Sequence, residues 1–358
     1  MTLREAIGQL FIFGFEGRES SRALETFVRE CNPGGLILFA RNLGGPEDVA
    51  ALTAALQTAS PTPLFIAIDQ EGGRVARLGP PFTQWPSPSA VGAVGSVKLT
   101  YALGEAMAKE LLAVGINMNL APVLDVLTNP ANPVMAGRSF GADPQVVGQL
   151  GTAFFWGHRD MGVLAVGKHF PGHGDTVVDS HSALPVVPHE LARLLAVELA
   201  PFIEVIGEGI PALMTAHLLL PALDPERPAT LSRPILTDLL RGRMGFSGLV
   251  LSDDLLMQGI ADTTPPGEAA VRFLEVGGDL ILICDDEAVQ REALAAVAEA
   301  VERGRLSEAR IRESRDRIAK AKALYAREPA SRSNNTIRQV VGCDAHRRLA
   351  ELLWTRAT

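Results

Sequence analysis

The stretch VLAVGKHFPGHGDTVVDSH, Val163 to His181, decides the expected fold, because an apolar run passes directly into a polar, glycine-containing segment. Val163 to Val166 have the composition of a buried strand, and the segment from Lys168 to His181 carries three histidines, two aspartates and a lysine. A buried strand that ends in ionisable residues is typical of α/β enzymes, which keep their chemistry at the carboxyl ends of their strands.

Similar apolar runs recur along the chain and predict eight strands, at Leu10 to Phe15, Gly35 to Ala40, Leu64 to Asp69, Asn117 to Leu124, Val163 to His169, Ala212 to His217, Leu249 to Ser252 and Leu280 to Cys284. Amphipathic patterns between most of them predict helices, for example at Thr100 to Val114, Pro144 to Met161, His189 to Ile206, Arg233 to Arg243 and Gly267 to Val276. Apolar strands that alternate with helices indicate a parallel sheet covered on both faces. Eight such units predict an α/β fold of the closed (β/α)₈ TIM-barrel type, with an open doubly wound sheet as the alternative.

Ionisable residues end five of the predicted strands, and this favours the barrel. They are Asp69, Asp125, the pair Lys168 and His169, His217, and Asp253. In a barrel the carboxyl ends of all strands converge on one face, so groups distant in sequence can meet over one substrate. An open sheet spreads the same groups along a line.

The domain organisation follows from the last quarter of the chain. Residues 1–326 are expected to form one catalytic barrel, whose final helix, Ser307 to Ala326, has a charged, solvated face. Arg327 to Asn335 has the composition of a linker, and Asp344 to Trp354 predicts a short helix that docks on the barrel. Residues 327–358 are thus expected to be a linker and a C-terminal helical extension.

Composition excludes several classes of partner. The 358 residues are 47% hydrophobic and carry a net charge of -8, which argues against nucleic-acid and anionic-membrane partners, because those surfaces recruit excess Lys and Arg. The three cysteines are far apart and have no zinc or disulfide spacing. No cationic leader or membrane-length apolar run is found, so a cytoplasmic protein is expected.

The tripeptide Asp179-Ser180-His181 is a candidate acid/base pair. A carboxylate two residues before an imidazole on an irregular loop can fix the ring's tautomer and stabilise its protonated form. The alternative is a surface loop whose side chains satisfy local backbone groups. His169, His173 and His181 with Asp175 and Asp179 could also bind a metal, but the paired spacing of metal-binding helices is absent, so no metal is expected.

Three further motifs carry candidate site residues. In LSDDL an aspartate can act as a nucleophile or cap the next helix, and position alone does not choose between Asp253 and Asp254. In IDQEGGRVAR, Asp69 and its neighbours suit a hydroxyl-rich ligand, unless Glu71 and Arg74 form a structural ion pair. Arg138 in AGRSFG is a lone loop arginine, a kind of residue more often solvated than functional.

Together these motifs resemble the family 3 glycoside hydrolases, and closely the bacterial β-N-acetylhexosaminidases of that family that act in cell-wall recycling. The matching stretches are IDQEGGRVARL, LAPVLDVLTNPANPVMAGRSFG, KHFPGHGDTVVDSH, ALMTAH and GLVLSDDLLM, which lie between residues 68 and 257. The resemblance implies a cofactor-free barrel that removes terminal β-linked N-acetylglucosamine (GlcNAc) from muropeptides of the GlcNAc-1,6-anhydro-MurNAc type, with retention of configuration.

The resemblance also implies roles for single residues. Asp253 is expected to be the nucleophile that forms a glycosyl-enzyme intermediate, and His181 with its partner Asp179 the general acid/base. The substrate contacts carried over by motif are Asp69, Arg77, Arg138, Lys168 and His169. A histidine suits the acid/base role because its unperturbed pKa, about 6.5, lies near neutrality.

Two other enzymatic readings and one non-enzymatic reading stay open. Phosphorolysis is an alternative to hydrolysis, because a neutral histidine repels inorganic phosphate less than a carboxylate does. A metal-dependent barrel hydrolase could use the same histidines, and a sugar-binding barrel without catalysis is the third reading. The sequence leaves the oligomeric state open, a monomer included.

Overall fold

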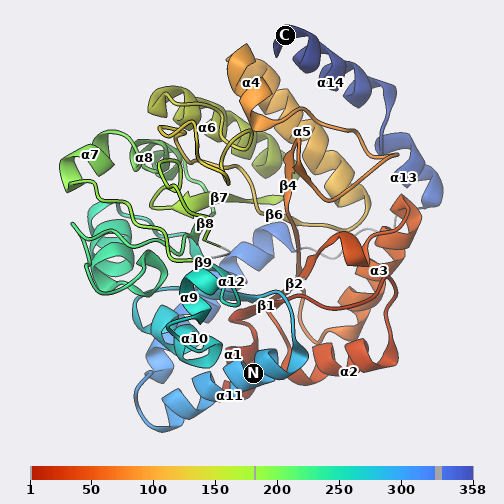
Figure 1. The fold of residues 1–358 in the computed structure, drawn as a ribbon. Helices are drawn as coiled ribbons and strands as arrows, with labels where there is room; N and C mark the ends of the chain where they lie inside the picture. Colours follow the sequence, from red (N-terminus) through yellow and green to blue (C-terminus); the bar gives the residue numbers. More distant parts are fainter. Residues whose placement is uncertain (1, 181–182, 327–332, 358) are drawn as a thin grey trace.

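Eight parallel strands close into a barrel in the computed structural model, which describes residues 2–180, 183–326 and 333–357 (Figure 1). Each strand pairs with the next in chain order, and the last pairs with the first through Phe11 and Ile281. The predicted (β/α)₈ barrel is confirmed and the open sheet is wrong. The strands are β1 (Phe11–Phe13), β2 (Gly35–Leu38), β3 (Phe65–Ile68), β6 (Met118–Asn119), β7 (Leu164–Phe170), β8 (Ala212–Thr215), β9 (Leu249–Asp254) and β10 (Leu280–Ile283).

All eight predicted strands are found, with ends that differ by a few residues. The largest difference is β6, which has only two residues in the regular ladder where eight were expected. The chain beyond it still pairs with β7, because Lys168 donates to the carbonyl of Pro122 and Leu124 donates to that of Lys168. A short hairpin of β4 (Gln70–Gly72) and β5 (Val75–Ala76) stands on the end of β3.

Helices surround the barrel and follow the predicted pattern. The helix α6 begins at its N-cap Asp143, has Pro144 in its first turn and ends at Gly162, which has a φ of +88°. The predicted helix from His189 to Ile206 is two helices, because Pro201 in a helix interior would remove a hydrogen bond and clash with the preceding turn. The helices that precede or follow strands are α1 (Leu3–Gly8), α2 (Arg22–Cys31), η1 (Ala40–Asn42), α3 (Pro46–Ala59), α4 (Pro88–Val94), α5 (Val97–Ala113), α6 (Pro144–Met161), α7 (Leu191–Ala196), α8 (Ala200–Gly207), η2 (Ala229–Leu231), η3 (Pro234–Arg243), α9 (Gln258–Ala261), α10 (Pro266–Glu275), α11 (Glu287–Glu302) and α12 (Glu308–Tyr325).

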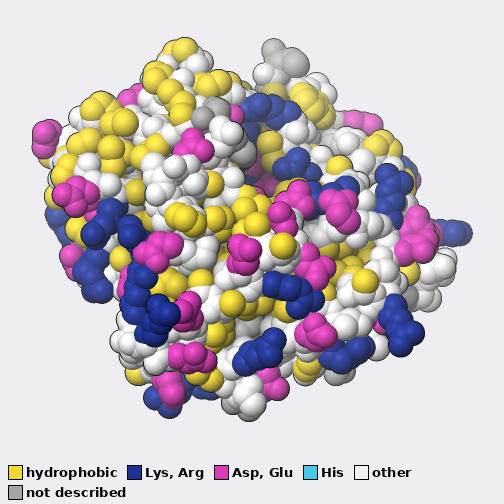
Figure 2. All heavy atoms as spheres, turned by 60° about the horizontal axis from the view of Figure 1, so that its bottom comes forward, with side chains coloured by type: hydrophobic (Ala, Val, Ile, Leu, Met, Phe, Trp, Pro, Cys, Tyr) yellow, Lys and Arg dark blue, Asp and Glu magenta, His cyan; other side chains and the backbone are white. Residues whose placement is uncertain are grey.

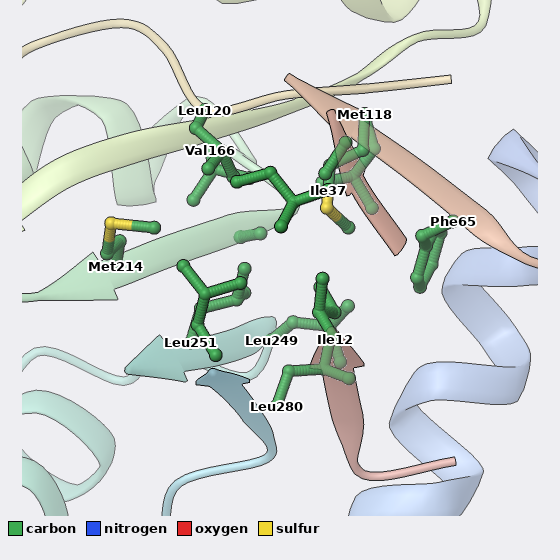
Figure 3. Packing of buried hydrophobic residues seen from close by; sticks show 14 of the residues in the cluster. Ile12, Ile37, Phe65, Met118, Leu120, Val166, Met214, Leu249, Leu251 and Leu280 are labelled. Carbon is green, nitrogen blue, oxygen red and sulfur yellow. The ribbon is translucent and has the colours of Figure 1, made fainter. Parts of the chain in front are cut away.

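The interior of the barrel is filled by apolar side chains from all around the sheet. Figure 3 shows Ile12, Ile37, Val166 and Leu251 pointing toward one another from four strands, and all four are at most 1% exposed. Full burial of such a side chain contributes about 1.5–3 kcal/mol. The barrel is therefore a packed core, and its chemistry must lie at the strand ends.

The C-terminal extension packs on one side of the barrel. Helices α13 (Asn334–Val340) and α14 (Asp344–Ala357) lie against α3, α4 and α5 (Figure 1). Glu110 of α5 joins them to the barrel, since its carboxylate accepts from the backbone of Gly342 at 3.0 Å and lies 2.7 Å from Nδ1 of His346. The predicted C-terminal helix is confirmed, and the division into domains at residue 326 stays a prediction.

The surface carries charges of both signs. Figure 2 shows Lys and Arg side chains interspersed with Asp and Glu on the face it presents. Within the described ranges, no helix is long and apolar enough to cross a bilayer. The predicted cytoplasmic location stays a prediction.

Candidate active site

A cavity of about 250 Å³ opens at the carboxyl ends of the barrel strands. Ligand pockets of proteins typically span roughly 300–1,000 Å³, so this one suits a ligand near the size of one sugar ring. Its walls combine apolar and ionisable side chains from seven strands or the segments that follow them. The lining residues are Ile37, Phe39, Asp69, Val75, Arg77, Leu120, Val134, Met135, Arg138, Lys168, His169, His173, Ser180, Met214, Asp253, Asp254, Met257, Leu282 and Cys284.

Two carboxylates and two cations form a network on one wall. Lys168 places Nζ 2.7 Å from Asp69 and 2.8 Å from Glu71, and Arg138 grips Glu71 with two hydrogen bonds of 2.9 and 2.7 Å. Burial raises the pKa of Asp69, but Lys168 and Arg77 outweigh it and lower that pKa to about 2. The network therefore presents a carboxylate and fixed cations to a polar ligand.

His169 is held from behind by a buried carboxylate. Its Nδ1 lies 2.7 Å from Asp125, which is fully buried, and its Nε2 lies 3.5 Å from Arg138. The pairing of β7 with β8 shifts register between Gly167 and Phe170. Both Lys168 and His169 line the cavity although they are adjacent in sequence, which a regular strand does not allow.

The end of β9 is also irregular and carries the two aspartates. Its pairing with β10 advances from Leu251 to Asp254 while the partner advances from Leu280 to Leu282, so β9 holds one extra residue. The hydroxyl of Ser252 accepts the backbone N–H of Leu282 at 2.9 Å and so restores a bond to the neighbouring strand. This bulge lies directly beside Asp253.

The two aspartates differ in their partners. Asp254 turns one oxygen to the backbone, accepting from Leu256 and Cys284, each at 3.2 Å. Burial raises the pKa of Asp254 to about 6, in spite of those backbone hydrogen bonds. Asp253 accepts the backbone N–H of Asp254 at 2.9 Å and lines the cavity. Both aspartates line the cavity, and they differ in that Asp254 also accepts two backbone hydrogen bonds from Leu256 and Cys284.

The polar segment after β7 lies beside these groups. His173 and Ser180 are buried and line the cavity, and Nε2 of His173 lies 3.1 Å from the hydroxyl of Ser180. The backbone carbonyl of Asp179 accepts from Ala183 at 3.1 Å. His181 lies outside the described residues, so the predicted pair of Asp179 and His181 is not tested.

Most of the sequence-predicted site residues come together. Six of the eight line one cavity, although they stand on five different strand ends or loops, and these are Asp69, Arg77, Arg138, Lys168, His169 and Asp253. The alternative of a Glu71–Arg74 ion pair is wrong, because Glu71 pairs with Arg138 and Lys168 while Arg74 donates to the carbonyls of Pro133 and Val134. The alternative of a solvated Arg138 is also wrong, since 11% of its side chain is exposed.

Sequence reasoning missed three supporting residues. Glu71 was considered as a ligand acceptor beside Asp69 or as a partner of Arg74, His173 only as a metal ligand, and Ser180 only as a spacer. Arg138 lies 67 residues from Glu71, whereas His173 and Ser180 are partners of each other only seven residues apart. The signals that could have found them are the glycines around His173 and the position of Glu71 directly beyond a strand end.

The two described histidines of this segment, His169 and His173, have hydrogen-bond partners within the protein. His169 is bonded to Asp125 through Nδ1, and both ring nitrogens of His173 have hydroxyl partners, Thr176 at 2.7 Å and Ser180 at 3.1 Å. Among the described residues, no group of three or more His, Cys, Asp or Glu side chains is arranged to hold a metal ion.

Comparison with known proteins places the chain among carbohydrate-active enzymes. The model of the glycosyl hydrolase family 3 N-terminal domain matches residues 2–321. A solved family 3 β-N-acetylglucosaminidase from Paenibacillus sp. str. FPU-7 is 43% identical, with a TM-score of 0.96 over 100% of this chain and 69% of that one. The β-hexosaminidase of Alkalilimnicola ehrlichii is 40% identical over 76% of this chain and 80% of its own length. β-Hexosaminidase A of Pseudoalteromonas piscicida is 40% identical over 92% of this chain, which spans only 59% of that relative's length.

Proposed function

This chain belongs to glycosyl hydrolase family 3 and to its β-hexosaminidase class of glycoside hydrolases, and from that premise we propose that it removes terminal β-linked GlcNAc with retention of configuration. The family and the enzyme class predicted from the sequence are confirmed. The observation that carries the mechanism is the placement of Asp253 in the same cavity as the Asp69, Lys168 and Arg138 network.

Asp253 is the nucleophile in this proposal. Retaining hydrolysis needs one carboxylate to attack the anomeric carbon and a second group to protonate the leaving oxygen. The bulge in β9 supports the assignment, because it displaces Asp253 from the regular ladder while Asp254 is engaged by the backbone. The fixed cations and Asp69 position the sugar hydroxyls, so that the attacking oxygen lies in line with the anomeric carbon.

His181, oriented by Asp179, is the general acid/base. A neutral imidazole in its base form adds no negative charge beside the anionic nucleophile, and its unperturbed pKa, about 6.5, suits proton transfer near neutrality. Support comes from the neighbouring Ser180, which lines the same cavity as Asp253. The imidazole first donates a proton to the leaving oxygen and then takes one from the attacking water.

The substrate is a GlcNAc-containing muropeptide fragment of the GlcNAc-1,6-anhydro-MurNAc type, hydrolysed in the cytoplasm. A cavity of about 250 Å³ accommodates one terminal sugar, which supports exo action. The net charge of -8 supports a small carbohydrate partner over a polyanion.

The test is hydrolysis of 4-nitrophenyl β-GlcNAc in phosphate-free buffer with a chelator present. Wild type is expected to hydrolyse it and to release the β-anomer first, as followed by proton NMR. Asp253→Ala and His181→Ala are expected to lose at least about 100-fold in kcat/KM, within the range general acid/base groups supply. Asp316→Ala on the outer helix α12, where 59% of the side chain is exposed, is the matched control and is expected to keep full activity.

Each alternative has its own result in this assay. GlcNAc 1-phosphate formed on adding phosphate, at the expense of free GlcNAc, would establish phosphorolysis. Loss of activity with chelator, restored by zinc, would establish a metal-dependent hydrolase. Sugar binding without turnover would establish a non-catalytic barrel.

A further inference from the structure

Ser180 is held from two sides by groups of different strand-end loops. Its hydroxyl lies 3.1 Å from Nε2 of His173, and its carbonyl accepts the backbone N–H of Gly259 at 3.0 Å. Only 3% of Ser180 is exposed. The residue that covalently joins Asp179 to His181 is therefore one of the fixed points of the segment.

His173 is itself a rigid partner. Its backbone N–H donates to the buried Asp125 at 2.6 Å, and its carbonyl accepts from Asn132 at 2.8 Å. Its Nδ1 lies 2.7 Å from the hydroxyl of Thr176. Burial lowers the pKa of His173, so the ring is neutral near pH 7, with one donor and one acceptor nitrogen for its two hydroxyl partners.

Gly259 makes the second contact to Ser180, and the two backbones can approach this closely because Gly259 has no side chain. It belongs to α9, the short helix that directly follows the bulged end of β9 with Asp253. A Cβ atom built on Gly259 would lie 2.8 Å from the carbonyl oxygen of Ser180 and 3.2 Å from that of Ala183. The first distance is too short for any Cβ, so an alanine there must displace the segment that carries Ser180.

We propose that His173 and Gly259 are positioning residues: they seat Ser180, which is covalently joined to Asp179 and His181, at the cavity that Asp253 lines, and proton donation to the leaving group depends on this seat. The inference rests on the proposed function. Gly259 ties the segment after β7 to the strand that carries Asp253, and His173 ties it to the β7 end itself through Asp125. The two contacts act on one residue whose neighbours on both sides are the proposed pair.

The test compares substrates with different leaving groups, because a misplaced acid/base group slows only those substrates whose leaving group needs a proton, whereas general damage to the site slows all of them. An alkoxide or phenoxide leaving group needs a proton from the enzyme, whereas 2,4-dinitrophenolate leaves without one. Ser180→Ala removes the hydroxyl that meets His173. It is expected to lower kcat/KM about tenfold for phenyl β-GlcNAc and less than about twofold for the 2,4-dinitrophenyl substrate, the scale of one lost hydrogen bond.

A second variant disturbs the other contact to Ser180, the one made by Gly259. Gly259→Ala is expected to show the same selective loss, and to a larger extent, because the added methyl displaces the segment. Ser307→Ala is the matched control, since the Ser307 hydroxyl caps the outer helix α12 by accepting the backbone N–H of Arg310. It is expected to lower the melting temperature slightly and to leave the ratio of the two kcat/KM values unchanged.

The outcomes distinguish this inference from the proposed function. Equal losses for both substrates in Ser180→Ala and Gly259→Ala, or unchanged kinetics in both, would overturn the positioning role. His181→Ala serves as the reference and is expected to show the strongest leaving-group selectivity. If His181→Ala shows no selectivity, the acid/base assignment fails, whatever the other variants do.

Discussion

The Nδ1 atom of His169 lies 2.7 Å from Oδ2 of Asp125, a carboxylate with no exposed surface. A carboxylate can only accept there, so Nδ1 carries a proton, while Nε2 lies 3.5 Å from Arg138 on the cavity side. The other oxygen of Asp125 accepts the backbone N–H groups of His169 at 3.3 Å and His173 at 2.6 Å. One buried side chain therefore orients two residues of the site.

Asp125→Asn is expected to lower both stability and activity. Both oxygens of Asp125 accept from N–H groups of His169 and His173. The Asn side chain has an NH₂ group in place of one oxygen, so at least one of these buried N–H groups loses its acceptor. We expect a loss of about 2–4 kcal/mol in the free energy of unfolding and at least a tenfold loss in kcat/KM. Urea unfolding and 4-nitrophenyl release measure the two effects. The control is Asp160→Asn, at a surface residue paired with Arg159, which should change neither the unfolding free energy nor the activation free energy by more than about 0.5 kcal/mol. An equal effect of the two substitutions would contradict the orienting role of Asp125.

Protonation of Asp69 is expected to destabilise the protein in acid. Its pKa is lowered to about 2 in the folded state, below the unfolded value of about 3.9, so the stability it contributes is present above pH 4 and is lost as pH falls through 2. The full effect is about 2 kcal/mol. The difference in unfolding free energy between wild type and Asp69→Asn should therefore shrink as the pH of urea titrations is lowered from 5 to 3. A difference that stays constant over this range speaks against the lowered pKa.

The stability contribution of Asp254 is expected to depend on pH with the opposite sign. Burial raises its pKa to about 6, so the folded state binds this proton more tightly than the unfolded state, and the group costs stability as pH rises from about 4 to 6. Asp254→Asn keeps an oxygen that can accept from Leu256 and Cys284 but has no charge to bury. Relative to wild type, the variant should gain about 1–3 kcal/mol between pH 4 and pH 7. A gain that does not grow with pH would show that the pKa of Asp254 is not raised in the folded protein.

Glu110 is expected to hold the C-terminal helices α13 and α14 against the barrel. Its two oxygens accept from the backbone and hydroxyl of Thr83, the backbone of Gly342 and the ring of His346. Glu110→Gln replaces one acceptor by a donor in this buried cluster, and we expect a loss of about 2–4 kcal/mol together with faster proteolysis around α13 and α14. Glu105→Gln on the same helix breaks only a partly exposed pair and is the control. Unchanged proteolysis in Glu110→Gln would show that apolar packing alone holds the extension.

Periodicity was sufficient to predict the fold. Apolar runs with polar ends, such as Val163 to His169, indicated both the buried strands and the face on which their carboxyl ends meet. The helix break at Pro201 was missed because the apolar pattern continues across it, whereas the proline's effect on the backbone is local.

The site could be predicted only in part. Strand-end positions placed Asp69, Lys168, His169 and Asp253 together, because barrel geometry brings such ends onto one face. The partner of Glu71 could not be found, since Arg74 is near in sequence and Arg138 is near in space. The bulge that separates Asp253 from its neighbour also depends on hydrogen bonds between strands, which no local pattern specifies.

The measurement that tests the central claim most directly is the capture of the glycosyl-enzyme intermediate. Wild-type enzyme is incubated with a 5-fluoro β-GlcNAc fluoride, which forms the ester quickly and loses it slowly, and the labelled peptide is sequenced by mass spectrometry. The account predicts one sugar per chain, attached to Asp253, and no label in Asp253→Ala. A label on Asp254 or on any other residue, or turnover to the inverted anomer without a labelled protein, would contradict it.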